Sequence, residues 1–270
     1  MNDIIIDGIV NNLGIKKESV IATLNLLDEG ATIPFIARYR KEVTGALDEE
    51  QIRSINDVYE YQVNLLKRKE DVIRLIDEIK DSILKCEKLV DVEDIYRPYK
   101  EKKKTKATEA IKNGLEPLAK IIMSFKNVDI KEIAKSYINE NVKDVGSATE
   151  GASYIIAEWI SDNASYRKWI RNNMMNRGII KTKKKKNSED NEGTYEMYYD
   201  YEEKIKFIKP HRVLAINRGE KEGVLSVNIY VDDDYIISYL EGKIIKNDKV
   251  MSADIVKNAI KDSYKRLIIP

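Results

Sequence analysis

The sequence contains almost no cysteine or histidine, with Cys86 and His211 as the only examples of each in 270 residues. One cysteine excludes an intrachain disulfide, and two soft ligands are too few for a structural zinc site. His211 follows Pro210 at an expected helix start, where a histidine is more typical of packing or capping than of general-base catalysis. The sequence therefore predicts no metal site built on these two residues.

Common catalytic motifs are also missing. The chain has no G-x-x-x-x-G-K-[ST] phosphate loop, no G-x-G-x-x-G, no G-x-S-x-G and no H-E-x-x-H. The acidic triplet Asp232–Asp234 lacks the ligand spacing of a calcium loop and is typical of a solvated turn. We therefore expect a region that is not an enzyme, with no catalytic residue, no cofactor and no metal site.

Long hydrophobic runs and an excess of one charge are absent as well. No segment approaches the roughly 18 apolar residues of a membrane span, and the start, MNDIIIDGIV, carries an acid where a signal peptide has cations. With 47 Lys and Arg against 46 Asp and Glu, the net charge is +1, so no global field draws the chain to nucleic acid. We expect a cytoplasmic chain without membrane contact, in which any binding of nucleic acid is local.

Helix signals dominate the first part of the chain. Gly14 separates two predicted short helices, and a third is predicted from about Ile33 to Val43. We expect the apolar face of this third helix to pack on the helix that follows it. That face comprises Phe35, Ile36 and Tyr39.

A capping box marks the start of a predicted long helix. Asp48 is the predicted N-cap and Gln51 its partner three residues later. Apolar residues then recur at spacings of three and four, and no glycine or proline lies between Gly45 and Pro98. We predict a spine helix of about 30 residues that continues without a break to at least Asp77.

The second half of the chain mixes helices with one strand. Helices are predicted at about 130–139, 149–175 and 252–267, and a mobile loop at about 182–193. The segment GVLSVNIYVDDD alternates like a half-buried strand, which needs a partner. That partner is either Tyr235–Ile245 or something that the chain lacks.

The predicted fold class is mainly α, a multi-helix assembly with helix-turn-helix character around the spine helix, plus a small β element near residues 224–245. We expect four segments along the chain. They are an N-terminal helical unit (1–90), a second helical unit (91–180), a mobile loop (181–194) and a small α+β segment (195–270).

Two basic runs differ in their neighbours. The run Lys183–Lys186 is followed by Glu189, Asp190 and Glu192, so we interpret it as a compensated, solvated loop. The run RPYKEKKKTK has only Glu101 against its cations in the sequence, and we predict that it contacts phosphates from an exposed loop. Its candidate binding residues are Arg97, Lys100, Lys102, Lys103, Lys104 and Lys106.

The helix IPFIARYRKE carries three further cations. Recognition helices usually place amides and small hydroxyls near their start, where this helix has Pro, Phe and Ile. We therefore interpret it as a packing element. We expect its cations to pair with acids of the spine helix, or to touch phosphates at most. They are Arg38, Arg40 and Lys41.

Several long blocks carry a family resemblance. LLDEGATIPFIARYRKEVTGALDEEQIRSI, DIYRPYKEKKKTKATEAIKNGLEPLA, HRVLAINRGEKEGVL and DSYKRLIIP follow one another between Leu26 and Pro270. Together they resemble the amino-terminal region of the bacterial Tex family, transcription accessory proteins related to a eukaryotic elongation factor that is also a histone chaperone. In that family a ribonuclease-H-like domain, helix-hairpin-helix elements and an OB-fold RNA-binding domain follow, so the resemblance implies that this chain is a fragment.

The resemblance also implies a function. The family's helical region implies a part in transcription and nucleic-acid binding, to RNA or DNA, without sequence preference. We therefore expect a scaffold region with an auxiliary nucleic-acid surface at residues 97–106, whose partners are nucleic acid, other domains of the parent protein and the transcription machinery. The alternative is a protein-docking module of the same parent with no nucleic-acid contact of its own.

Overall fold

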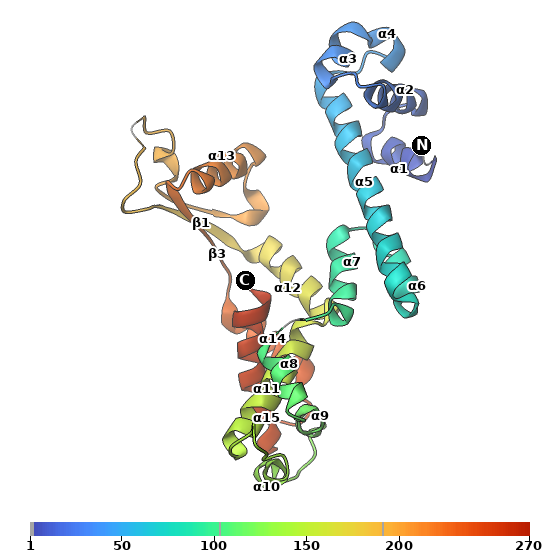
Figure 1. The fold of residues 1–270 in the computed structure, drawn as a ribbon. Helices are drawn as coiled ribbons and strands as arrows, with labels where there is room; N and C mark the ends of the chain where they lie inside the picture. Colours follow the sequence, from blue (N-terminus) through green and yellow to red (C-terminus); the bar gives the residue numbers. More distant parts are fainter. Residues whose placement is uncertain (1–2, 103, 191) are drawn as a thin grey trace. The chain divides into compact units, whose positions relative to one another are not determined.

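Helices dominate the structure, which confirms the predicted fold class. The structure is a computed structural model that describes residues 3–102, 104–190 and 192–270. Over these residues it contains fifteen α-helices and one three-stranded antiparallel sheet (Figure 1). No helix of the described residues is both long enough and apolar enough to cross a membrane. The chain divides into two compact units, residues 1–96 and 97–270.

The first unit begins with short helices joined by tight turns. The helices α1 (Asp3–Leu13) and α2 (Lys17–Asp28) separate at Gly14, as predicted. The predicted helix from 33 to 43 is wrong, because it is two helices, α3 (Ile33–Tyr39) and α4 (Lys41–Thr44). Arg40 breaks them with φ −130° and ψ 26°, which lies outside the helical region.

The spine helix is α5 (Glu49–Leu75), and its start follows the predicted capping box. The Asp48 side chain accepts from the Gln51 N–H at 2.8 Å, and the Gln51 side chain accepts from the Asp48 N–H at 3.0 Å. The helix is 27 residues long and ends before Asp77, because Ile76 is extended. Shorter elements complete the unit: the 3-10 helix η1 (Asp77–Ile79), α6 (Lys80–Leu84) and α7 (Leu89–Tyr96).

The core of this unit corrects the expected packing of α3. Ile36 is fully buried among residues of α1, α2 and α5, and Ile33 and Ala37 pack beside it. Phe35 is 40% exposed and Tyr39 62% exposed, so the prediction that both rings pack on the spine helix is wrong. The spacings of three and four in Ile33, Ile36 and Ala37 direct that face inward and leave the ring pair at the surface.

The helical part of the second unit surrounds α11. Two of its predicted helices end differently: the helix at 130–139 stops at Lys135, and the helix at 149–175 is two helices, because Asn163 caps a new one by accepting from the Tyr166 N–H at 3.1 Å. The elements are η2 (Arg97–Tyr99), α8 (Lys106–Lys112), α9 (Glu116–Met123), α10 (Ile130–Lys135), α11 (Val145–Ser161) and α12 (Ala164–Arg177).

The sheet of the second unit contains a strand that was not predicted from the sequence. Strand β1 (Ile179–Lys184) lies between β2 (Asp200–Lys204) and β3 (Leu225–Tyr230), antiparallel to both. The expected loop is therefore strand up to Lys184, and β1 is the partner of the predicted strand. Tyr235–Ile245 is not, because it falls almost wholly in the helix α14 (Asp233–Ile244).

Helices between and after the strands complete the second unit. The short helix predicted after Pro210 is α13 (Pro210–Lys221), which lies beside the sheet in Figure 1. Its Ile216 belongs to one hydrophobic cluster with Leu225 and Val227 of β3. The predicted last helix is α15 (Met251–Asp262), which continues as a π-helical turn, η5 (Ser263–Ile268). The remaining short turns are η3 (Glu196–Tyr198) and η4 (Ile205–Phe207).

Asp190 organises the connection between β1 and β2. Its carboxylate accepts from the N–H groups of Thr194 and Tyr195 at 3.0 and 2.9 Å, and from the Tyr199 hydroxyl at 2.8 Å. These bonds, led by the backbone bond from Tyr195, hold the pKa of Asp190 below its usual range. The mobility expected of this segment stays a prediction, and Asn191 lies outside the described residues.

Asp190→Ala is expected to lower the thermal midpoint of the second unit at neutral pH. Because the pKa of Asp190 is lower in the folded state, its stabilisation is complete above the ordinary value of about 3.9 and is lost as pH falls through the folded value. The difference in midpoint between the variant and the parent should therefore shrink as the pH falls below about 3.9. Circular dichroism melts from pH 7 to pH 2 measure it.

Asp248→Ala is the matched control for this prediction, since Asp248 is an exposed aspartate of the same unit. It should leave the midpoint nearly unchanged across the pH range. If both variants lowered the midpoint equally at neutral pH, the hydrogen bonds of Asp190 would contribute nothing specific.

Candidate nucleic-acid interface

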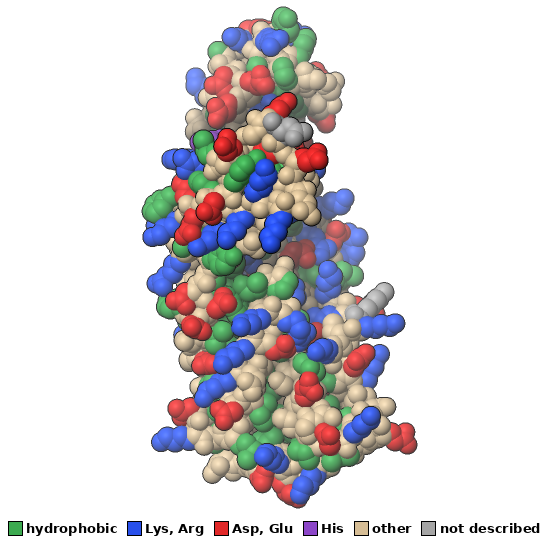
Figure 2. Space-filling model, turned by 90° about the vertical axis from the view of Figure 1, so that its left-hand side faces the viewer, with side chains coloured by type: hydrophobic (Ala, Val, Ile, Leu, Met, Phe, Trp, Pro, Cys, Tyr) green, Lys and Arg blue, Asp and Glu red, His purple; other side chains and the backbone are tan. Residues whose placement is uncertain are grey.

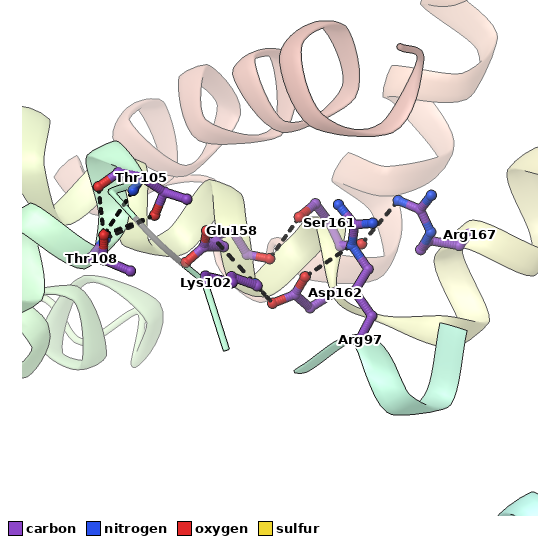
Figure 3. Close-up of polar contacts among 8 residues, drawn as sticks. All are labelled: Arg97, Lys102, Thr105, Thr108, Glu158, Ser161, Asp162 and Arg167. Carbon is purple, nitrogen blue, oxygen red and sulfur yellow. Dashed lines mark hydrogen bonds and ion pairs between the residues drawn. The ribbon is translucent and has the colours of Figure 1, made fainter. Parts of the chain in front are cut away.

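Two cations of the basic loop, residues 97–106, are paired with acids at the end of α11. The Nε atom of Arg97 lies 3.2 Å from a carboxylate oxygen of Asp162, and Lys102 forms an ion pair with the same carboxylate (Figure 3). Lys102 Nζ also lies 3.6 Å from Glu158. Glu101 is the only acid near these cations in sequence, but the fold brings Glu158 and Asp162 against them, so the expectation that Glu101 alone opposes them is wrong. These pairs are partly shielded from water, since the Asp162 side chain is only 11% exposed.

Hydrogen bonds fix the backbone on both sides of this ion-pair cluster. At the start of α8, Thr105 accepts from the Thr108 N–H at 3.0 Å, and the Thr108 hydroxyl oxygen accepts from the Thr105 N–H at 2.8 Å. At the end of α11, the Ser161 hydroxyl donates to the Glu158 carbonyl at 2.9 Å, and Arg167 donates to the Ser161 carbonyl at 3.4 Å (Figure 3). The loop thus enters α8 through a capping box, and the end of α11 that carries its acidic partners is itself held by hydrogen bonds.

The other loop cations point to solvent. Lys100, Lys104 and Lys106 are exposed, and Lys104 adopts a left-handed backbone with φ +50°. Lys106 Nζ lies 3.1 Å from the Tyr154 hydroxyl and 4.4 Å from the centre of its ring, and that hydroxyl in turn donates to the Glu150 carboxylate. Lys103 lies outside the described residues. The loop therefore presents three described, exposed lysines.

The cations of α3 and α4 form a separate set in the first unit. Arg38, Arg40 and Lys41 are all exposed, and within the described residues no ion pair joins them to α5, contrary to one expectation. Arg40 instead donates to the Tyr39 carbonyl at 3.2 Å, and its guanidinium carbon lies 5.2 Å from the centre of the Phe35 ring. Arg40 therefore lies beside an exposed pair of aromatic rings, Phe35 and Tyr39.

The surface elsewhere is mixed in charge. On the face drawn in Figure 2, Lys and Arg side chains alternate with Asp and Glu over short distances, and hydrophobic side chains show between them. This agrees with the net charge of +1 and leaves local groups of cations as the sites where a polyanion would bind.

Two features of the site were not predicted from the sequence. Glu158 and Asp162 are four apart, which places them on one face of α11, but their pairing with the loop spans about sixty residues and has no local signal. The ring pair of Phe35 and Tyr39 did have a signal, since their spacing of four is out of phase with Ile33, Ile36 and Ala37.

Comparison with known families places both sets of cations in context. The family model of the Tex-like protein N-terminal domain matches residues 3–77, and that of the Tex central region-like domain matches residues 126–259. The chain belongs to the Tex family. In this Tex-family chain α3 and α4 lie inside the first matched segment, and the basic loop lies between the two.

Several relatives are similar to this Tex-family chain over most of its length. YdcI of Bacillus subtilis is 48% identical over 274 residues, which cover 97% of the chain and 38% of YdcI. The transcriptional accessory protein Tex of Neisseria gonorrhoeae is 36% identical over 221 residues, 79% of the chain and 29% of that protein. The human S1 RNA-binding domain-containing protein 1 is 28% identical over 270 residues, 92% of the chain and 27% of that protein. The chain thus spans well under half the length of these relatives.

Proposed function

We propose that this Tex-family region is a scaffold of a transcription accessory protein and that it binds RNA or DNA without sequence preference. The names of two relatives, one a transcriptional accessory protein and one an S1 RNA-binding domain-containing protein, support this class of function. We further propose that it acts in the cytoplasm, beside other domains of its parent and the transcription machinery, without catalytic activity of its own.

The proposal rests on the two roles that the cations of the basic loop play. Arg97 and Lys102 pair with acids of α11 and hold the loop, while Lys100, Lys104 and Lys106 remain exposed on it. A held loop loses less conformational freedom when it binds than a free one does. Lysine ammonium groups act as point charges toward phosphate, and phosphate contacts carry no sequence information, which accounts for binding without sequence preference.

The salt dependence of binding tests this assignment. On duplex, the three lysine–phosphate contacts of the loop should give a slope of log K against log salt of about −2.7. Lys100→Glu combined with Lys104→Glu should weaken binding to all sequences alike and flatten the duplex slope to about −0.9. Fluorescence anisotropy with labelled oligonucleotides across a salt series measures both quantities.

A matched control changes the net charge equally elsewhere in the second unit. Lys126→Glu combined with Lys131→Glu reverses two exposed lysines, and it should leave the slope close to that of the parent. If the loop and control variants lost affinity equally, net charge rather than the loop would govern binding. If the loop variant bound like the parent, the loop would not contact phosphates.

A docking module without nucleic-acid contact is the second candidate. It is favoured by the pairing of Arg97 and Lys102 with acids and by a groove of about 750 Å³ between α10, α11 and α15. Apolar side chains form much of the groove wall, including Ile130, Val145 and Ile255. Failure of the parent chain to bind any oligonucleotide at low salt would favour this candidate.

A further inference from the structure

An exposed pair of aromatic rings stands on α3. Phe35 and Tyr39 lie one helical turn apart, with ring centres 5.3 Å apart and planes tilted by 44°. They are 40% and 62% exposed, although the neighbouring Ile36 is fully buried. Aromatic rings contribute strongly to the free energy of binding when a partner covers them, so an exposed adjacent pair indicates a binding surface.

Three cations lie close to this ring pair in sequence, and one of them contacts it. Arg38, Arg40 and Lys41 are exposed, and the sequence from Ile33 to Lys41 contains no acid. The Arg40 side chain is directed by its hydrogen bond to the Tyr39 carbonyl and lies over the Phe35 ring. Positive charge around stacked or exposed rings is complementary to a polyanion that carries flat bases, and it is unfavourable to a purely apolar partner.

We propose that this aromatic patch, formed by Phe35, Tyr39, Arg38, Arg40 and Lys41, binds single-stranded nucleic acid by stacking bases on its rings while its cations contact phosphates. The inference rests on the proposed function and adds a second, structurally separate contact surface to it. Bases in a duplex are already stacked on one another, so exposed rings select single strands. Stacking is tolerant of sequence because every base has a flat face.

The geometry indicates which ring carries the contact. Each stacked contact takes about 3.5 Å, so a base between the two rings would need about 7 Å, and a centre-to-centre distance of 5.3 Å leaves no room for it. Bases must therefore stack on the outer faces. Arg40 already covers one face of Phe35, whereas Tyr39 is the more exposed ring. Tyr39 is thus the principal stacking residue, and Phe35 supports it.

The test compares a strand that has bases with one that lacks them. The full chain and its Tyr39→Leu and Phe35→Leu variants are titrated with a deoxythymidine oligonucleotide of about 20 nucleotides, an abasic strand of equal length and a duplex. We expect Tyr39→Leu to bind the deoxythymidine strand about tenfold more weakly, with a smaller loss for Phe35→Leu. Binding to the abasic strand and to the duplex should not change.

The matched control removes an exposed ring elsewhere. Phe207, which is 60% exposed in the second unit and lies beside Lys206, is also replaced by leucine. Phe207→Leu should leave binding to all three probes unchanged. Thermal midpoints of all variants should match the parent, because each ring is largely outside the core.

The outcomes separate this inference from the proposed function. If the Tyr39→Leu and Phe35→Leu double variant binds the deoxythymidine strand like the parent, or loses equally on the abasic strand, the stacking site is overturned. If reversal of Lys100 and Lys104 still weakens binding in that case, the proposed function stands without it. If the parent binds no oligonucleotide at low salt, both are overturned.

Discussion

The Ile55→Ala substitution is expected to lower the free energy of unfolding of the first unit by about 2–5 kcal/mol. Ile55 is fully inaccessible to solvent on α5, and it belongs to the cluster in which α1, α2 and α3 meet that helix. Removing its branched side chain loses the transfer free energy of the buried carbons. It also leaves a cavity that helices fixed on several sides cannot fill.

Leu75→Ala is the matched control for this substitution, because Leu75 lies in the last turn of the same helix and is 64% exposed. It should change the free energy of unfolding by no more than about 0.5 kcal/mol. Urea titrations should follow helical circular dichroism, since both tryptophans, Trp159 and Trp169, lie in the second unit and do not report on the first. Equal losses for the two variants would show that Ile55 is not a core residue.

Glu158→Gln combined with Asp162→Asn is expected to strengthen the binding of nucleic acid while it destabilises the second unit. The two carboxylates neutralise Arg97 and Lys102, so their removal releases two cations at the loop. If both then meet phosphates, the duplex slope of log K against log salt should steepen from about −2.7 to about −4.5. The thermal midpoint should fall, because partly buried ion pairs are lost.

A control for the released charge uses acids that pair with lysines outside the loop. Glu116→Gln combined with Glu132→Gln makes the same change of charge and frees Lys120 and Lys135, whose ion pairs are exposed. This variant should leave the slope and the midpoint near those of the parent. A Glu158→Gln, Asp162→Asn variant whose slope stayed unchanged would argue that Arg97 and Lys102 cannot reach phosphates even when released.

The start of the spine helix was predictable because neighbouring residues decide it. Asp48 and Gln51 form a capping box within one turn. The break at Arg40 was not predictable, because no glycine, proline or capping residue marks it. The break after Asp162 did have a local signal, since Asn163 is a favoured N-cap residue and caps α12.

The missed strand and the missed ion pairs have a common cause. The segment IIKTKK carries an alternation of Ile180 and Thr182 with lysines, but its charge is more typical of a loop. Its hydrogen-bond partners, β2 and β3, lie further along the chain. The acids that pair with Arg97 and Lys102 are likewise distant in sequence, so only the tertiary structure brings these groups together.

The chain order of the sheet has a consequence for biosynthesis. Strand β1 lies in the middle of the sheet, yet it leaves the ribosome before both of its partners. In that interval its backbone N–H and C=O groups have no strand to pair with, which in a more apolar segment would favour pairing with another nascent chain. Lys181, Lys183 and Lys184 repel a second copy of the same segment. We expect the lysines that make β1 resemble a loop in sequence to disfavour its self-association until β2 and β3 have been synthesised.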